Sequence, residues 1–555
     1  MMDLDTITAA AAALRAGTTT SKALVEKVIR QADTWDGPLG VFLDRYQETA
    51  LAAAERADAD FAAGIDRGPL QGIPLGIKDI ITTSEGPTTA QSLILDPIWG
   101  DRQDAPVVAR LRAAGAIIVG KASTMEFAIG LPDPDKPFPV PRNPWNLDTW
   151  TGGSSSGTGS GVAAGLFLGG LGTDTGGSIR IPAAYCGITG LKPTFGRVPK
   201  SGCVPLGYSL DHIGPMARSA ADCAAMLQVM AGQDASDPYT TDVPVPDYSA
   251  ALTGSLDGLR VGFERGALAA APVIDPAVPA ALAAAESVFG DAGAAVRDSV
   301  LDCYDELTIV DWITMAAEAF AYHRGDLAER WNDYGRPTRR FVAQGALVSS
   351  ADFVQAQRLR TDLVRQLGEL FVDLDVLIMP TASTGAPRFD TLDMESMMGT
   401  IFTPAWNTVG LPVASVPMGF TADGMPLGMQ IIGRPMAEAT VLRVADAFQR
   451  QTDWHLRAPE LPAGAVGTTL PAFNTDPVAD ADREAAAVTT ALLLADGITV
   501  PADDLAALVK GHRELAQMSG CLRRARGELN PALGFNPGTP RTATSSSLIE
   551  VAPAA

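Results

Sequence analysis

Apolar residues follow two different spacings along the chain, and each spacing predicts its own kind of element. Across residues 5–35 they recur at nearly helical intervals, with a break at Gly17 and a new helix start at residues 18–21. A second stretch, residues 46–64, is rich in Ala, Glu and Asp and also reads as a helix. Further helices are predicted at residues 105–114, 276–290 and 311–371.

Short apolar runs bounded by glycine and proline predict strands. Residues 69–81 (PLQGIPLGIKDII) change to this pattern, which suits strands and turns. The five prolines of residues 131–141 predict an extended loop. Because strands alternate with helices, we expect an α/β sandwich around a largely buried sheet. The other strands are predicted at residues 116–119, 165–170, 375–379 and 412–418.

The pattern changes after about residue 460. Residues 481–496 and 502–526 are predicted helices, and the second carries one largely apolar stripe: Leu505, Leu508, Val509, His512, Leu515, Met518 and Leu522. A helical pair of this size holds little core by itself, so we expect it to dock on the main domain or on a partner. The expected division is a main domain at 1–460, a linker at 461–480, a small helical segment at 481–535 and a flexible tail at 536–555.

The charge balance disfavours one class of function. The chain has 42 Lys and Arg against 64 Asp and Glu, a net charge of −22. Such a surface repels phosphate backbones, so we expect no nucleic-acid binding.

Other features bear on location and cofactors. The N-terminus lacks the basic start and apolar core of a secretory signal, and the longest apolar run, residues 162–172, is too short to span a membrane. Five scattered cysteines indicate no disulfide framework, which favours a reduced, cytoplasmic protein. The four histidines lack metal-ligand spacing, so neither a metal nor a cofactor is expected.

Two familiar motifs are present only in part. Gly115–Lys121 (GAIIVGK) matches the first seven positions of a phosphate loop, but Ala122 stands where magnesium binding needs Ser or Thr. Residues 153–157 (GSSSG) fit a nucleophile elbow centred on Ser155, although the residues before them make a poor strand. We set both interpretations aside.

The strongest chemical signal is the stretch 151–183, TGGSSSGTGSGVAAGLFLGGLGTDTGGSIRIPA. Two small-residue loops, each with two glycines followed by a serine, surround an apolar segment; these serines are Ser154 and Ser178. Glycine lets the backbone approach a ligand closely, and successive N–H groups ahead of a predicted helix at 179–186 form an anion nest. An anion nest beside a serine hydroxyl is what acyl transfer requires.

This stretch resembles the signature of the amidase-signature family. The resemblance continues through GIPLGIKD at 72–79, AGAIIVGKASTMEFA at 114–128 and GLKPTFGRVPKSG at 190–202, and on to PLGMQIIG at 426–433. It implies a three-layer α/β/α fold around a large mixed central sheet, with residues 1–460 as the catalytic domain and the small helical segment appended at the C-terminal side.

Carried over motif by motif, the resemblance implies a Ser-cisSer-Lys triad. Ser178 is the expected nucleophile, Ser154 the bridging serine after a cis peptide bond, and Lys78 the base. The apolar residues around Lys78 favour burial, which lowers a lysine pKa and leaves a neutral amine to take a proton from Ser154, while Ser154 takes one from Ser178.

The loops around the nucleophile have expected supporting roles. The backbone N–H groups of Thr175, Gly176, Gly177 and Ser178 are expected to hold the oxyanion. The supporting residues are Ser155, Asp174 and Arg180; the last two form an expected ion pair that either orients the loop or is purely structural.

Apolar residues near these motifs suggest the substrate class. The predicted pocket residues are Met125, Phe127, Phe138, Phe402 and Trp406, with Met397 and Met398 as further lining. They favour a neutral, fairly hydrophobic small molecule: an amide, anilide, carbamate or ester, as in urethane-cleaving members of the family. The expected assembly is a monomer or homodimer.

One alternative stays open. Glutamine-hydrolysing subunits of tRNA amidotransferases, which pass ammonia to a partner, share the signature. They carry an aspartate just before the residues that match Ile401-Phe402-Thr403, where this chain has Thr400. That difference disfavours glutamine. The C-terminal helices resemble the small helical partner subunits of some members, here fused to the chain.

Overall fold

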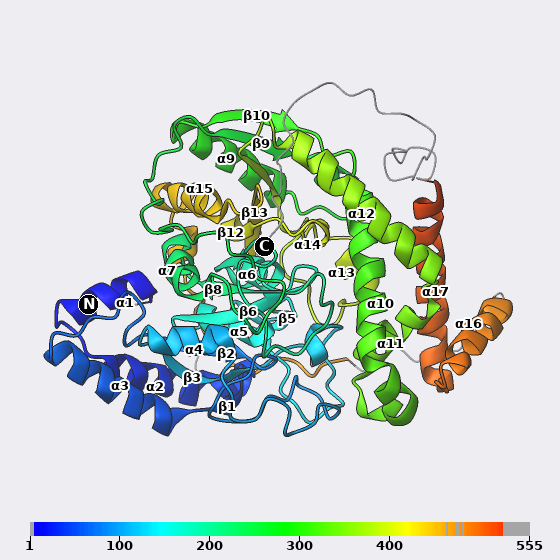
Figure 1. Ribbon diagram of the computed structural model, residues 1–555, viewed down its shortest axis with the longest axis horizontal. Coiled ribbons are helices and arrows are strands. Elements are labelled where there is room, and N and C mark those ends of the chain that lie inside the picture. The colour runs from blue at the N-terminus through cyan, green and yellow to red at the C-terminus, as the bar shows by residue number, and fades with distance from the viewer. Residues whose placement is uncertain (1–4, 462–463, 472–477, 480–481, 525–555) are drawn as a thin grey trace, which may run out of the picture.

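The computed structural model describes residues 5–461, 464–471, 478–479 and 482–524, and its centre is a large mixed sheet (Figure 1). The strands are β1 Phe42–Arg45, β2 Pro74–Lys78, β3 Ile117–Ala122, β6 Gly169–Asp174, β7 Thr189–Lys192, β8 His212–Ala217, β9 Arg260–Glu264, β10 Ala295–Ser299, β11 Val376–Pro380, β12 Val413–Phe420 and β13 Pro426–Gly433. Within the described chain these eleven pair in the order β1-β3-β2-β6-β8-β7-β12-β13-β11-β9-β10, while β4 (Arg142–Asn143) and β5 (Asn146–Trp150) pair separately. Strand β2 is parallel to β3 and β6, and β9 to β10 and β11; the remaining pairs in the large sheet are antiparallel.

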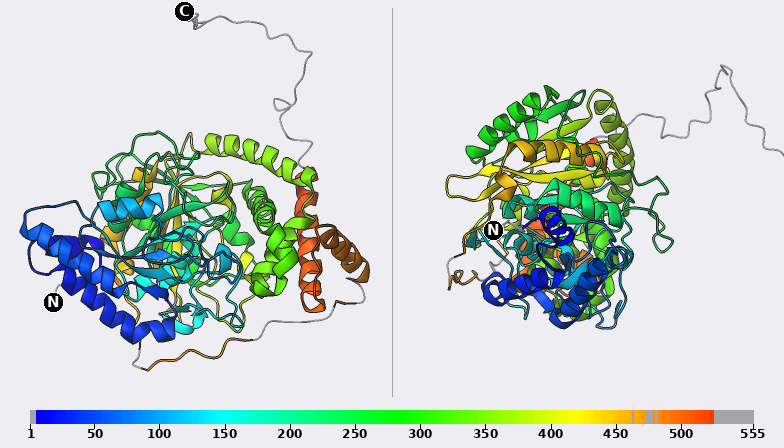
Figure 2. Two further views of the ribbon diagram at one scale, coloured as in Figure 1. Left: turned by 60° about the horizontal axis from the view of Figure 1, so that its bottom comes forward. Right: turned by 90° about the vertical axis from the view of Figure 1, so that its left-hand side faces the viewer.

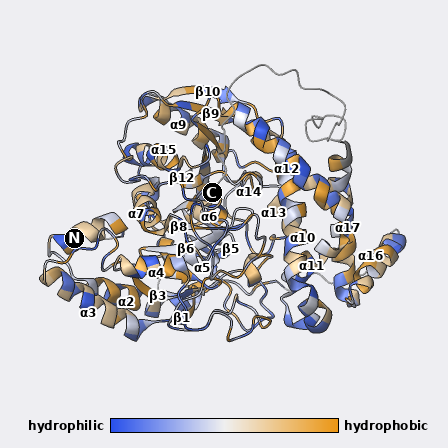
Figure 3. Cartoon of the chain, in the orientation of Figure 1, coloured by the Kyte–Doolittle hydropathy of each residue, from blue (hydrophilic) through white to orange (hydrophobic). Residues whose placement is uncertain are grey.

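Helices cover the sheet in the three-layer arrangement that the sequence predicts. They are α1 Ile7–Arg15, α2 Ser21–Leu39, α3 Gln47–Ala62, α4 Pro106–Ala113, α5 Ser156–Ala163, α6 Arg180–Cys186, α7 Ala220–Met230, α8 Gly266–Ala270, α9 Ala277–Asp291, α10 Tyr304–Arg330, α11 Arg336–Gln344, α12 Ser350–Leu370, α13 Met394–Met398, α14 Ala405–Thr408, α15 Glu438–Gln451, α16 Arg483–Ala495 and α17 Ala502–Arg524. Helices α7, α9 and α15 contact one another and the sheet, and α5 and α6 form a second packed pair against it. In Figure 3 the outer helices α2 and α12 mix polar and apolar residues, as expected for helices with one buried face.

The N-terminal helices begin and end where the sequence indicates. The Thr6 hydroxyl accepts a hydrogen bond from the N–H of Ala9 and caps α1, and Thr20 caps α2 through the N–H of Ala23. Between them Gly17 has a φ of +66°, a left-handed conformation that interrupts the helix. The predicted break at Gly17 is therefore confirmed.

The glycine- and serine-rich segment differs from expectation. Residues 156–163 (SGTGSGVA), for which the sequence predicts no helix, form helix α5, and the strand predicted at 165–170 is displaced to residues 169–174. A Cβ on Gly157 would lie 2.5 Å from Ser123 Oγ, and one on Gly161 would lie 2.3 Å from the Phe167 ring. Small residues are therefore needed because α5 packs tightly against its neighbours, and this tertiary packing overrides their low helix propensity.

The C-terminal helical segment docks on the main domain. Helix α17 contacts α10, α11 and α12, and α16 packs against α17 (Figures 1 and 2). Leu508, Leu515 and Leu522 of the predicted stripe belong to the main hydrophobic core. Asp504, which is fully buried, accepts hydrogen bonds from the side chains of Trp331, Arg339 and Arg340. The segment is thus part of the same packed structure.

The described part of the linker also lies against the main domain. Its residues 461, 464–471 and 478–479 form neither helix nor strand. The N–H of Thr468 donates to Asp148 (2.8 Å), and Leu470 packs beside the cluster that contains Trp150. The predicted tail, 536–555, and residues 525–535 lie outside the described residues. In the described part of the chain, no helix combines the length and apolar character needed to cross a bilayer.

Candidate active site

The sheet topology brings the three predicted catalytic side chains together. Lys78 is the last residue of β2, and β6, its parallel neighbour, ends at Asp174 just before the loop that holds Ser178. Ser154 precedes α5, which packs on β2 and β6. Because neighbouring parallel strands end at the same edge of a sheet, both serine loops meet the end of β2.

Lys78 is hydrogen-bonded to hydroxyl groups on three neighbouring residues. Its ammonium nitrogen lies 2.7 Å from Ser154 Oγ, 3.0 Å from Ser155 Oγ and 2.7 Å from the hydroxyl of Thr173. The side chain is completely buried. Burial, which disfavours the charged form, lowers the pKa of Lys78 from 10.5 to about 7. Near neutral pH the amine can therefore accept a proton.

Ser154 and Ser155 play different geometric parts. The peptide bond between Gly153 and Ser154 is cis, as the family resemblance implies. Ser155 is fully buried, its hydroxyl donating to the carbonyl of Thr173 and accepting from the Thr173 N–H. The N–H of Ser155 donates to the carbonyl of Ser178 (3.2 Å), which ties the two serine loops together. Ser155 is thus enclosed, and the nucleophile-elbow interpretation finds no support.

Ser178 faces a pocket. Its side chain is half-buried, and it lines a small cavity of about 50 Å³ together with Ser154, Gly153 and Gly176. Among the described residues, the N–H groups of Gly176 and Ser178 have no hydrogen-bond partner, whereas the N–H of Gly177 donates to Asp174 Oδ1 (2.8 Å). The prediction that Gly177 supplies an oxyanion donor is therefore not met in this structure, because the carboxylate already holds that N–H.

Asp174 and Arg180 organise the nucleophile loop. Their ion pair (2.8 Å) is completely buried, and the carboxylate also accepts from the N–H groups of Gly177 and Ile179. Burial alone would raise the pKa of Asp174, but the Arg180 charge and the hydrogen bonds outweigh it and hold that pKa well below its usual range. Arg180 further donates to the side chain of Asn407 (2.6 Å). The fixed carboxylate thus defines the backbone on both sides of Ser178.

The pocket wall differs from the sequence prediction. The residues around Ser178 are Ala128, Ile129, Gly130, Trp150, Gly153, Ser154, Gly176, Ile181, Leu206, Trp312, Met315, Met394, Met397, Met398, Ile401 and Pro404. Met397 and Met398 were expected, but the five principal candidates, Met125, Phe127, Phe138, Phe402 and Trp406, are absent from this wall.

The five residues have other surroundings. Phe127 packs edge-on against His323 with ring centroids 4.3 Å apart, and Phe402 lies against Tyr304. Met125 and Trp406 are buried, and Phe138 is half-exposed on its loop. The sequence prediction chose one of the right segments, because Ile401 and Pro404, next to Phe402, do line the pocket. It did not identify which side chains of that segment face the pocket. Trp312 and Met315 of α10 carry no motif that would have identified them.

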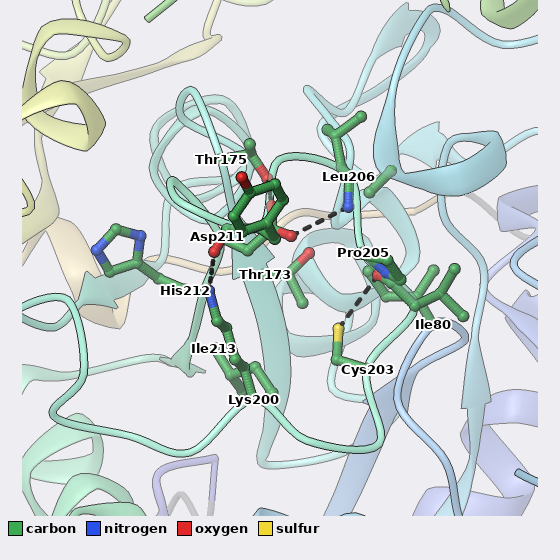
Figure 4. Close-up of a pocket in the computed structure, with 13 residues that line it drawn as sticks. Ile80, Thr173, Thr175, Lys200, Cys203, Pro205, Leu206, Asp211, His212 and Ile213 are labelled. Carbon is green, nitrogen blue, oxygen red and sulfur yellow. Dashed lines mark hydrogen bonds between the residues drawn. The ribbon is translucent and has the colours of Figure 1, made fainter. Parts of the chain in front are cut away.

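A second, larger chamber adjoins this pocket, and a smaller cavity lies beside Thr173 and Thr175. The larger chamber, of about 660 Å³, shares Trp312, Met394 and Met398 with the Ser178 pocket. The smaller one, of about 120 Å³, includes Thr173 and Thr175, whose hydroxyl donates to Asp211 (2.6 Å) (Figure 4). Thr175 therefore presents its side chain to this cavity.

The partial phosphate-loop motif has a structural role. Lys121 is completely buried in β3, pairs with Asp79 (3.1 Å) and donates to the hydroxyl of Thr88. Its segment forms the fully buried strand β3, as the apolar residues of this motif predict. Within the described residues, no group of three or more His, Cys, Asp or Glu side chains is placed to hold a metal ion.

Comparisons with known proteins match most of the chain to one family. The family model Amidase matches residues 23–442. A glutamyl-tRNA(Gln) amidotransferase subunit from Roseiflexus sp. (strain RS-1) is 42% identical over 488 residues, covering 82% of this chain and 98% of the relative. The corresponding subunit from Methylococcus capsulatus is 38% identical, covering 82% of this chain and 99% of the relative.

Solved structures are similar over the same region. A chain from a protein complex connected with the origins of an s-triazine catabolic enzyme has a TM-score of 0.75 at 31% identity, covering 79% of this chain and 97% of that one. Native peptide amidase from Stenotrophomonas maltophilia has a TM-score of 0.70 at 29% identity, covering 82% of this chain and 98% of that one.

Proposed function

The chain belongs to the amidase-signature family and is an enzyme acting on the C–N bond of amides, and from this premise we propose that it hydrolyses a small, largely apolar amide through an acyl-enzyme on Ser178. The observation that carries the proposal is the buried Lys78 amine, 2.7 Å from Ser154 Oγ, with a pKa lowered to about 7 by burial. Both Ser154 and Ser178 line the adjoining pocket. A lysine that is about half neutral at pH 7 and contacts Ser154, which shares a pocket with Ser178, supports the Ser-cisSer-Lys triad.

In the proposed mechanism, neutral Lys78 takes the proton of Ser154 as Ser154 takes that of Ser178. The Ser178 oxygen attacks the amide carbonyl, and the tetrahedral intermediate collapses when Ser154 returns a proton to the leaving nitrogen. Water then attacks the acyl-enzyme with the same relay as base and releases the acid.

The proposed oxyanion hole uses the N–H groups of Gly176 and Ser178. Asp174 accepts from the N–H groups of the intervening Gly177 and of Ile179, which leaves the other two amides available to a ligand. Thr175 is a weaker candidate than the resemblance implied, because it lines the cavity of Figure 4 and not the pocket of Ser178. Removing one donor of this kind typically lowers kcat by about 100- to 1,000-fold.

The substrate preference follows from the pocket wall. Trp150, Trp312, Met394, Met397 and Met398 surround Ser178 with apolar surface. None of the described residues that form this wall carries a charged side chain, so it favours a neutral scissile group: an amide, anilide, carbamate or ester.

Glutamine hydrolysis in an amidotransferase is the second candidate, and the names of the curated relatives favour it. Position 400, where the resemblance implies an aspartate in such subunits, holds a threonine whose hydroxyl donates to the carbonyl of Met397 (2.9 Å). This contact braces the pocket wall and places no carboxylate there for a substrate amino group. The wall therefore supports the first candidate.

The test is a substrate panel of an acyl anilide, an aryl carbamate, a primary aliphatic amide and glutamine. We expect turnover of the anilide or carbamate by the wild type, loss of turnover in Ser178→Ala, and a smaller loss in the matched variant Ser155→Ala. Glutamine as the only substrate would support the amidotransferase candidate. Activity that survives Ser178→Ala would refute the nucleophile assignment.

A further inference from the structure

The large chamber adjoins the pocket of Ser178. The two share Trp312, Met394 and Met398 in their walls, so the chamber begins where the space around Ser178 ends. The inner pocket, about 50 Å³, accommodates only the atoms nearest the scissile bond, whereas the chamber's 660 Å³ lies within the range of small-molecule sites. The rest of a substrate molecule therefore has room in the chamber but not in the inner pocket.

One wall of this chamber is built by the C-terminal segment. Helix α17 contributes Ala507, Lys510, Gly511, Glu514 and Met518, and the preceding linker contributes Leu470 and Pro471. All of them lie beyond residue 442, where the match to the family model ends. The opposite walls come from the proline-rich loop, α11 and residues 389–398.

The wall formed by α17 is fixed rather than loosely attached. Leu508 and Leu515 of this helix are buried in the main core, on either side of the lining residue Gly511. At the start of the helix, buried Asp504 pairs with Arg339 (2.9 Å) and Arg340 (2.8 Å) of α11. A wall held by both core packing and buried ion pairs can contribute to specificity.

The lining specifies the chemistry of the occupant. Trp312, Phe341 and Phe389 are buried aromatic residues that face the chamber, while Asp390 and Lys510 are exposed. The buried part of the wall is therefore largely aromatic, and charges of both signs are present, from half-buried Arg340 and Glu514 as well as from the exposed residues. This arrangement fits an elongated substrate with an apolar body and does not select for a net charge.

We propose that the chamber walled by α17 binds the apolar body of an elongated amide substrate and sets the enzyme's preference for chain length. The inference rests on the proposed amide hydrolysis and assigns to the C-terminal segment a role in substrate selection.

The experiment compares 4-nitroanilides of acetic, butyric, hexanoic and octanoic acid, together with acetamides of a matching series of alkylamines. For wild type, kcat/KM should rise with chain length in at least one series, by up to about fourfold per buried methylene. Ala507→Trp fills the chamber and should lower kcat/KM for the longest substrate by about tenfold or more, with little change for the shortest.

A matched control is available on the same helix. Ala516 is exposed and lies nine residues further on, half a turn away from the chamber-facing side, so Ala516→Trp should leave the length dependence unchanged. Met518→Trp, from the same wall, provides a second test if Ala507→Trp fails to fold, as judged by its thermal unfolding.

The outcomes separate the two proposals. If wild type hydrolyses short and long substrates equally in both series, or if the chamber variants lower all lengths equally, the inference is wrong although amide hydrolysis stands. If wild type hydrolyses none of these amides, the proposed function fails and the inference fails with it.

Discussion

The buried Lys78 predicts a specific pH dependence of activity. Its pKa, lowered by burial from 10.5 to about 7, means that about 1% of the amine is neutral at pH 5, about half at pH 7 and about 99% at pH 9. Because only the neutral amine can take the Ser154 proton, kcat/KM should rise about tenfold per pH unit up to pH 6 and level off above pH 8.

The assay is kcat/KM for an uncharged anilide between pH 5 and pH 10. Enzyme held at each pH should regain full activity when returned to pH 8, which separates titration from denaturation. An ordinary lysine would give a rate that keeps rising tenfold per unit beyond pH 9, and that result would refute the assignment of Lys78 as a base with a lowered pKa.

The same perturbation has a consequence for stability. Between pH 7 and pH 10.5 the unfolded chain holds a proton on Lys78 that the folded protein lacks, so stability rises with pH across this window. Below pH 7 the folded protein carries the full cost of a buried ammonium, at most roughly 5 kcal/mol from the change in pKa. Replacing Lys78 by an apolar residue also removes its hydrogen bonds to three hydroxyl groups, worth about 1 kcal/mol each.

Lys78→Met should therefore be inactive and yet more stable than wild type at pH 6, by about 2 kcal/mol. The advantage should vanish near pH 8 and reverse to a deficit of about 2 kcal/mol at pH 10, because the cost of the buried ammonium falls with pH while the lost contacts do not. Denaturant unfolding at the two pH values checks this. A variant less stable than wild type at pH 6 would contradict the view that Lys78 is kept for catalysis at the expense of stability.

Three further predictions concern other parts of the structure. Asp504→Ala removes the partner of two α11 arginines and should destabilise the protein by about 3–5 kcal/mol in thermal or denaturant unfolding. Asp503→Ala, at an exposed position, should change stability little. Equal effects of the two substitutions would refute the anchoring role of Asp504. Burial raises the pKa of the Asp311 carboxyl well above 3.8, so the unfolded chain ionises first and stability falls as pH rises above 3.8. Asp311→Asn should remove this loss, so its unfolding free energy relative to wild type should increase as pH rises from 3.8 toward the raised pKa, as measured by denaturant unfolding. Gly177 has a φ of +134°, and a Cβ at this position would collide with Thr403 Oγ1. Gly177→Ala should therefore reduce kcat for the anilide at least about 100-fold. A kcat near that of the wild type would show that the loop geometry around Ser178 is not critical.

Sequence patterns predicted the cluster of Lys78, Ser154 and Ser178 better than they predicted the pocket wall around it. Lys78, Ser154 and Ser178 each lie in a short motif at the end of a strand or the start of a helix, so local sequence identifies them. The pocket wall depends on how α10, more than a hundred residues later, crosses the edge of the sheet, and Trp312 has no local signal for that placement. Phe127 was a reasonable candidate by position, but it turns into the core against His323.

The sequence pattern does not predict helix α5, for a related reason. Its glycines and serines predict a loop, because each has low helix propensity. Their small size allows the helix to pack closely against Ser123 and Phe167. This packing involves residues distant in sequence, so the sequence of the segment alone does not predict it. The apolar stripe on residues 502–526 can be predicted from the sequence. The chamber that this helix lines depends on how the helix docks against α11 and α12.

The central claim is that Ser178 carries the acyl group, and trapping tests it most directly. The wild type is treated with an alkyl fluorophosphonate, digested, and the modified peptide is located by mass spectrometry. The account predicts a single adduct on Ser178, lost in Ser178→Ala and slowed in Lys78→Met. An adduct on Ser155, or amide turnover in an enzyme that forms no adduct on Ser178, would contradict it.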